Sequence, residues 1–285
     1  MSEEPQDNAI PAFHPHGPVP KGRRIGNIEA KFILPNLITV LAICAGLTGI
    51  RLGYEGRTEE AIGLVLLAAF LDGIDGRLAR AMKAQSKFGA QMDSLADVIN
   101  FGAAPALVLY ASILDQARSV GWIAAMIYVI ACCLRLARFN VMADDPNRPA
   151  WMSDFFVGVP APFGAFLVML PAYLEFLGVP GGKGFAMGAS IFTLIVALLM
   201  ISELPVFSGK TSFARVPSEW IMPVLLGAAI YVALLLTFTW EMLTLSTIAY
   251  FCFLPFGPRA FKKRQAAESA AKAMMPTVVD SDATE

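Results

Sequence analysis

The stretch DGIDGRLARAMKAQSKFGAQMDSLAD, residues 72–97, places four aspartates at the adjoining ends of two apolar runs. Asp72 and Asp75 are three residues apart, and Asp93 and Asp97 are four apart, so each pair falls on one face of a helix. A charged side chain in a membrane helix costs about 2.5–3.5 kcal/mol on insertion scales, so such a cluster needs a compensating role. The stretch therefore predicts two neighbouring helices whose aspartates face one pocket.

The chain as a whole has the composition of a membrane protein. It is 285 residues long, 56% hydrophobic and 16% charged, and its mean hydropathy is +0.59. Soluble domains contain about 25% charged residues, so this chain falls outside that class. Its 22 basic and 23 acidic residues nearly cancel, which gives no indication of a nucleic-acid partner.

Apolar stretches close to the 20 residues that cross a hydrocarbon core recur along the sequence. They predict an all-α, polytopic membrane helical bundle with about eight transmembrane helices. The expected extents are 32–51, 60–82, 91–114, 119–140, 157–178, 184–203, 219–238 and 240–257, with polar loops at 141–156 and 204–218. We expect residues 1–28 to be a disordered cytosolic leader, 29–258 the membrane domain and 259–285 a cytosolic tail.

The distribution of basic residues predicts the orientation, because Lys and Arg near span ends remain on the cytoplasmic side. With both termini inside, the outer side keeps only Arg51, Arg57, Arg118 and Lys183. We therefore expect an integral protein of the cytoplasmic (inner) membrane, with both termini in the cytoplasm. The aspartate pocket would then lie at the cytoplasmic face.

Four carboxylates at low dielectric repel one another unless cations intervene, so the pocket is expected to hold metal. The cysteines lie in apolar runs without metal-site spacing, and the only histidines, His14 and His16, belong to the leader. An oxygen-only ligand set favours Mg²⁺ or Mn²⁺, and two ions could share bridging carboxylates. The alternative for any single Asp–Arg pair is an ordinary interfacial position.

The residues Asp72-x2-Asp75-Gly76-x2-Ala79-Arg80-x8-Gly89-x3-Asp93-x3-Asp97 fill every position of the signature of the CDP-alcohol phosphatidyltransferases. The chain thus resembles that family. Further segments are similar to its branch of membrane-integral bacterial and archaeal phosphatidylserine synthases: Leu34-Pro-Asn-Leu-Ile-Thr39, Arg135-Leu-Ala-Arg-Phe-Asn140, Gly158-Val-Pro-Ala-Pro162 and Phe207-Ser-Gly-Lys210. The resemblance puts the catalytic core at about 32–215, and the last two spans carry no motif that we use.

The resemblance implies a homodimeric enzyme of phospholipid biosynthesis that moves a phosphatidyl group from CDP-diacylglycerol to L-serine and releases CMP. Two divalent ions would be held by Asp72, Asp75, Asp93 and Asp97, with Asp97 also the general base. A carboxylate suits that role because the membrane part of the chain contains no histidine. The implied CDP contacts are Asn36, Asp72, Gly76, Ala79, Arg80 and Gly89.

Recognition of serine requires a cation for its carboxylate. Arg135 and Arg138, three apart on one helical face, are the candidates, with Asn100 and Asn140 as further polar contacts. The alternative is that both arginines, like Lys210, are ordinary positively charged flanks of a span.

Several other functions are compatible with parts of the pattern. A sister enzyme could use glycerol 3-phosphate, inositol phosphate or choline, although choline would favour an aromatic box. An ion-coupled transporter would place its carboxylates near the bilayer midplane and often shows internal repeats, neither of which this sequence indicates. A nonenzymatic scaffold leaves the aspartates unexplained.

Overall fold

The computed structural model describes residues 30–84, 86–143, 155–207, 218–259 and 261. The predicted leader, most of the predicted tail and residues 208–210 lie outside this part of the chain. The elements are α1 (Ala30–Tyr54), α2 (Thr58–Ala81), α3 (Lys87–Asp97), the π-helix η1 (Val98–Ala103), α4 (Ala104–Ser112), the 3₁₀-helix η2 (Leu114–Ala117), α5 (Ser119–Ala143), β1 (Phe155–Val157), α6 (Ala161–Val168), α7 (Leu170–Phe176), α8 (Lys183–Ile201), β2 (Pro205–Phe207), α10 (Ser218–Thr237) and α11 (Thr239–Phe253).

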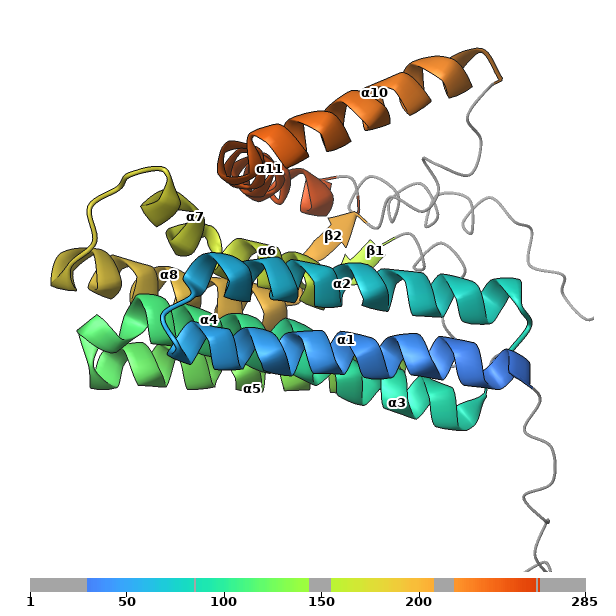
Figure 1. Ribbon diagram of the computed structural model, residues 1–285, viewed down its shortest axis with the longest axis horizontal. Coiled ribbons are helices and arrows are strands. Elements are labelled where there is room, and N and C mark those ends of the chain that lie inside the picture. The colour runs from blue at the N-terminus through green and yellow to red at the C-terminus, as the bar shows by residue number, and fades with distance from the viewer. Residues whose placement is uncertain (1–29, 85, 144–154, 208–217, 260, 262–285) are drawn as a thin grey trace, which may run out of the picture.

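The long helices α1, α2, α5 and α8 run side by side with the continuous helix α3–η1–α4 (Figure 1). Five helical segments in the described residues are long and apolar enough to cross a membrane: Ile33–Tyr54, Lys87–Ser112, Ser119–Met142, Lys183–Ile201 and Glu219–Thr237. The prediction of an all-α membrane bundle is therefore confirmed, and the chain is an integral membrane protein. The number of eight spans stays a prediction.

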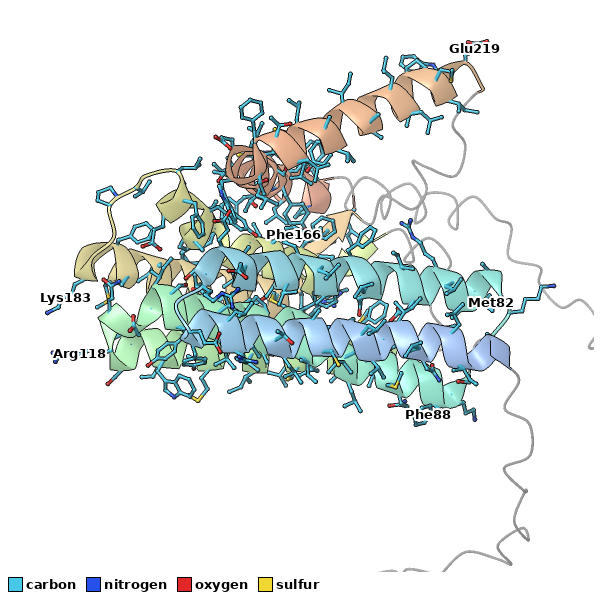
Figure 2. All side chains as sticks on the ribbon, in the orientation of Figure 1. Met82, Phe88, Arg118, Phe166, Lys183 and Glu219 are labelled. Atoms are coloured by element: carbon cyan, nitrogen blue, oxygen red, sulfur yellow. The ribbon has the colours of Figure 1, made fainter. Side chains whose placement is uncertain are left out.

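The two ends of the bundle carry different residues. Arg118 and Lys183 lie together at one end, and Met82 and Phe88 lie at the other (Figure 2). Met82 and Phe88 flank the connection between α2 and α3. These two helices carry the four aspartates. The aspartate helices thus meet at the end opposite to two of the four basic residues that were assigned to the outer side.

A π-helix interrupts the third apolar segment directly after Asp97. Pro105 has no N–H, so the carbonyl of Phe101 cannot receive its usual helical hydrogen bond. The buried hydroxyl of Tyr128 donates to that carbonyl at 2.9 Å. The Ala104 N–H donates to the carbonyl of Ile99, five residues back. The wide turn is therefore stabilised by a partner from α5.

The fifth apolar segment differs from the expected continuous helix over 157–178. Helix α6 begins at Ala161, and Met169 separates it from α7. Pro171 accounts for the break, because it cannot donate to the carbonyl four residues earlier.

The two loops expected at 141–156 and 204–218 are joined by a short sheet. Strands β1 and β2 pair antiparallel, with Phe155 opposite Phe207 and Val157 opposite Pro205. Gly158 continues the connection: its N–H donates to the Leu204 carbonyl at 2.9 Å, and its φ is +75°. The first loop therefore ends at β1, and the second begins at β2, shortly after α8.

The carboxyl-terminal helices pack less closely. Every described side chain of α10 is at least partly exposed, and α10 extends away from the bundle (Figure 1). Helix α11 returns to it through aromatic contacts: Trp240 stacks on Phe176 with ring centroids 4.3 Å apart, and Tyr250 stacks on Phe163 at 4.5 Å. Helix α11 is thus the element that connects this region to the bundle.

Candidate active site

A polar cavity of about 170 Å³ lies between α1, α2 and α3. It contains most of the positions predicted to contact CDP, together with two of the aspartates. Its lining comprises Pro35, Asn36, Thr39, Asp75, Gly76, Ala79, Arg80, Ala84, Ser86, Gly89, Ala90 and Asp93. The structure thus brings six signature positions and Asn36 of the first span into one cavity, whereas Asp72 and Asp97 are not among its lining residues.

Local hydrogen bonds shape this cavity. The Ser86 hydroxyl caps α3 by accepting from the Gly89 N–H at 2.9 Å. A Cβ at Gly89 would lie 3.1 Å from both Asn36 Oδ1 and Ser86 Oγ, so glycine allows α1 to approach closely here. A Cβ at Gly76 would meet nothing within 4 Å, so the wall on that side is open to a bulky ligand.

Three of the four aspartates form a compact cluster. Asp72, Asp75 and Asp93 each present an oxygen, and these atoms all lie within 4.8 Å of one another. Asp75 is 3% exposed, and its Oδ2 accepts a hydrogen bond from Thr39 at 2.6 Å. Asp97 lies beside the cluster, with its carboxyl group against that of Asp72.

The residues of this cluster fit a hard divalent cation. Oδ1 of Asp72 and Oδ1 of Asp75 are buried and have no hydrogen-bond partner among the described residues. Buried carboxylate oxygens without partners are costly, and a cation would satisfy them. The donors are all oxygen, which is the ligand type that Mg²⁺ and Mn²⁺ prefer. An aspartate cluster able to hold a metal is therefore present.

Arg135 stands next to this cluster. Arg135 is 8% exposed, and its guanidinium interacts electrostatically with Asp97. The Cζ atom of the guanidinium lies 5.6 Å from the centroid of the Phe139 ring. Its Nε has no acceptor in the described part of the chain. A buried cation with a free donor beside Asp97 is suited to bind an anion.

The other three predicted acceptor contacts differ in their surroundings. Arg138 donates to the Ile201 carbonyl at 2.9 Å, and so it secures the end of α8. Asn140 donates to the Ser94 hydroxyl at 3.1 Å on the exposed surface. Asn100 is fully buried, and a Cβ at Gly46 would lie 2.6 Å from its Oδ1, so its amide faces α1. Arg135 interacts electrostatically with Asp97, and Asn100, three residues after Asp97, has both amide atoms buried without a hydrogen-bond partner among the described residues.

Sequence reasoning missed two contributors to the site. Thr39 and Ser86 hold Asp75 and the start of α3, respectively. Ser86 three residues before Gly89 could have been identified as a helix cap. Thr39 lies in a segment quoted above, but its pairing with Asp75 depends on how α1 and α2 pack.

Comparison with known proteins identifies the same region. Residues 32–204 match the model of a family described as CDP-alcohol phosphatidyltransferase. Residues 219–255 match a second model, CDP-alcohol phosphatidyltransferase 2. The last two spans, in which sequence reasoning found no motif, therefore carry a family pattern of their own.

Curated proteins with related sequences are named as synthases of serine phospholipids. A CDP-diacylglycerol–serine O-phosphatidyltransferase of Mycobacterium bovis is 39% identical over 246 residues, which cover 85% of this chain and 82% of that protein. The protein of that name from Mycobacterium leprae is 40% identical, covering 83% and 77%. An archaetidylserine synthase of Methanothermobacter thermautotrophicus is 33% identical, covering 62% and 70%.

Proposed function

The chain belongs to the CDP-alcohol phosphatidyltransferase family, and from this premise we propose that it transfers the phosphatidyl group of CDP-diacylglycerol to L-serine and releases CMP. The observation that carries this proposal is the aspartate cluster beside a buried arginine. The names of its relatives support serine as the acceptor.

The donor nucleotide is proposed to bind in the polar cavity. Arg80 would donate to phosphate oxygens, since a guanidinium can bind them with two parallel hydrogen bonds. Gly76, Ala79 and Gly89 leave room for the nucleotide, and Asn36 supplies a polar contact from α1. The acyl chains would stay in the surrounding lipid.

We assign the metal site to Asp72, Asp75, Asp93 and Asp97, for Mg²⁺ or Mn²⁺ and for two ions. Bound ions of this kind neutralise charge on a pyrophosphate and polarise the phosphorus that is attacked. Thr39 would fix the orientation of Asp75 for this purpose. The compactness of the first three aspartates supports the assignment.

Asp97 is proposed as the general base. In the reaction, the serine hydroxyl oxygen forms a bond to the phosphorus that carries the diacylglycerol. The bond from that phosphorus to the bridging oxygen of CMP breaks, and the hydroxyl proton passes to Asp97. Its place between Asp72 and Arg135 supports this role, because the acceptor would meet the base and a cation together.

Several features of the whole protein remain proposals as well. We infer eight spans, both termini in the cytoplasm, a site at the cytoplasmic face of the inner membrane and a homodimer. The opposite placement of Arg118 and Lys183 relative to the aspartate helices supports this orientation. Residues 29–258 would form the membrane domain, between a leader at 1–28 and a tail at 259–285.

The alternative is a sister enzyme that uses glycerol 3-phosphate, inositol phosphate or choline. The deciding experiment incubates purified protein with CDP-diacylglycerol, Mn²⁺ or Mg²⁺, and each alcohol, and measures CMP release. We expect release to depend on L-serine and to stop in excess EDTA. Release with glycerol 3-phosphate but not with serine would overturn the serine assignment, and full turnover in EDTA would overturn the metal assignment.

A further inference from the structure

Tyr250, on α11, is an electrostatic neighbour of Arg135 in the candidate acceptor site. Its hydroxyl group and the guanidinium of Arg135 interact electrostatically, although α11 follows α5 by about a hundred residues in the sequence. Arg135 in turn interacts with Asp97. Arg135 therefore has electrostatic neighbours on two other helices, Asp97 at the end of α3 and Tyr250 on α11.

Two of these groups are buried hydrogen-bond donors without acceptors. Within the described residues, neither Arg135 Nε nor the Tyr250 hydroxyl has a hydrogen-bond partner. A guanidinium can only donate, and a phenol hydroxyl donates readily. Because buried polar groups are nearly always paired, two unpaired donors near one another indicate a ligand that accepts from both. The positive charge of Arg135 makes an anion the suitable ligand.

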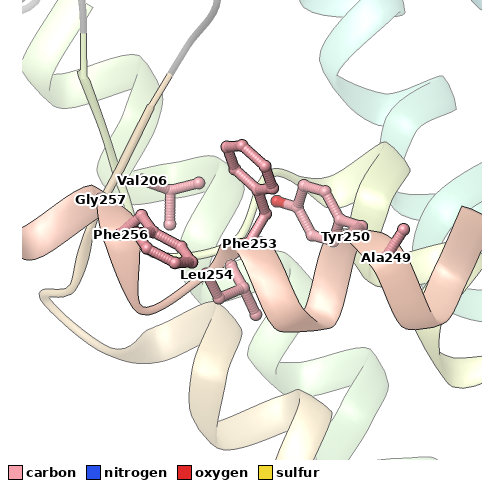
Figure 3. Close-up of a pocket in the computed structure, with 7 residues that line it drawn as sticks. All are labelled: Val206, Ala249, Tyr250, Phe253, Leu254, Phe256 and Gly257. Carbon is pink, nitrogen blue, oxygen red and sulfur yellow. The ribbon is translucent and has the colours of Figure 1, made fainter.

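The Tyr250 ring is held by apolar neighbours. It stacks on Phe163 with the two planes 7° apart. It also lines an apolar cavity of about 470 Å³, whose other lining residues are Val206, Ala249, Phe253, Leu254, Phe256 and Gly257. Figure 3 shows the Tyr250 hydroxyl as the only side-chain oxygen among these residues. The ring is thus packed as a hydrophobic group, and its polar tip is left to bind something else.

We propose that Tyr250 determines acceptor specificity, with its hydroxyl donating a hydrogen bond to the carboxylate of the acceptor alcohol beside Arg135. The inference rests on the proposed function. A carboxylate offers two oxygens, one for each donor, while the acceptor hydroxyl lies towards Asp97. An acceptor without an anionic group would leave both donors unpaired and would be disfavoured.

The test compares Tyr250→Phe with the unchanged protein, using L-serine and serinol, which carries a hydroxymethyl group in place of the carboxylate. The substitution removes the donor and keeps the stacked ring. We expect KM for L-serine to rise about ten-fold or more, because a hydrogen bond to a charged group is lost. KM for CDP-diacylglycerol, and turnover with serinol, should change less than about two-fold on the same reasoning.

Tyr231→Phe is the matched control. Its hydroxyl bonds to Ser246 at 2.9 Å between α10 and α11, so its removal should leave KM for serine unchanged. An unchanged KM in Tyr250→Phe overturns the inference, and so does an equal loss with serine and serinol, which indicates a structural role. Absence of serine-dependent CMP release by the unchanged protein would instead overturn the proposed function.

Discussion

At the scale of single residues, the four aspartates have different surroundings although the sequence presents them as two similar pairs. Asp75 is nearly buried and fixed by Thr39. Asp72 keeps a buried oxygen without a partner in the described chain. Asp97 alone interacts with both an aspartate of the cluster and Arg135. These surroundings support metal binding by Asp72 and Asp75 and proton transfer by Asp97.

Replacing Asp97 by Asn tests this division of roles. The amide cannot accept a proton, so CMP release should fall by about 10²–10⁴-fold, the range attributed to general acid–base catalysis. Binding of CDP-diacylglycerol, measured by equilibrium titration, should change far less. Asp115→Asn, at an exposed position in η2, is the control and should retain full activity. Turnover close to that of the control would remove Asp97 from the base role.

Helical spacing predicted the aspartates of the site, because it places each pair on one helix face. The other signature residues of the cavity followed from the family resemblance, whereas Thr39 and Ser86 were not predicted. The sequence could not distinguish Arg135 from Arg138 as acceptor contacts, since the two arginines look equivalent in it. Arg138 is bound to a carbonyl 63 residues away, whereas Arg135 turns towards Asp97. Tyr250 lies farther still along the chain, and no local pattern marks it. Contacts of this kind depend on how distant helices pack.

At the scale of elements, hydropathy located the α-helices of the described residues but not the irregularities within them. The π-helix, the break at Met169 and the β1–β2 pair each depend on a specific contact or proline. The apolar segments expected at 91–114 and 157–178 continue through the π-helix and the break, so hydropathy gives no signal of either. The two strands lie at the edges of the predicted polar loops, where hydropathy gives no sign of pairing. Backbone groups freed by Pro105 and Pro171 explain the π-helix and the break.

The junction at Gly158 provides a stability prediction. An alanine there would need φ near +75°, and its Cβ would lie 2.4 Å from the Met200 carbonyl oxygen. Gly158→Ala should therefore destabilise the protein by about 2 kcal/mol or more. Thermal unfolding in detergent measures this as a lower Tm.

Gly188→Ala is the control for that experiment. Gly188 lies within α8, and a Cβ there would meet nothing within 4 Å. Because alanine has a higher helix propensity than glycine, the Tm of the Gly188→Ala variant should stay the same or rise. Equal Tm values for the two variants would contradict the described packing at Gly158.

At the scale of the whole molecule, the polar site lies at one end of an apolar bundle whose outer surface carries large hydrophobic side chains. Phe70, Leu95 and Leu198 are each at least 65% exposed, which suits a surface covered by lipid. The site can then receive a lipid from the side and water-soluble reactants from the end.

Labelling of introduced cysteines tests the orientation of the bundle. Lys183→Cys, at the end that carries Arg118, should react with a membrane-impermeant maleimide in intact cells. Lys87→Cys, beside Phe88 at the other end, should react only after permeabilisation. The four native cysteines lie in helices, and the unchanged protein gives their background. Labelling of Lys87→Cys in intact cells, with Lys183→Cys reacting only after permeabilisation, would show that the protein has the opposite orientation.

The π-helix has a consequence for how the chain tolerates shortening. A π turn accommodates about one residue more than an α turn over the same path. Loss of one residue between Val98 and Ala103 would leave an ordinary α-helix that still presents Asp97 and α4 in their present directions. Loss of one residue within the regular helix α8 would rotate every later side chain by about 100°. The segment that follows Asp97 is therefore the place where this bundle can absorb a deletion.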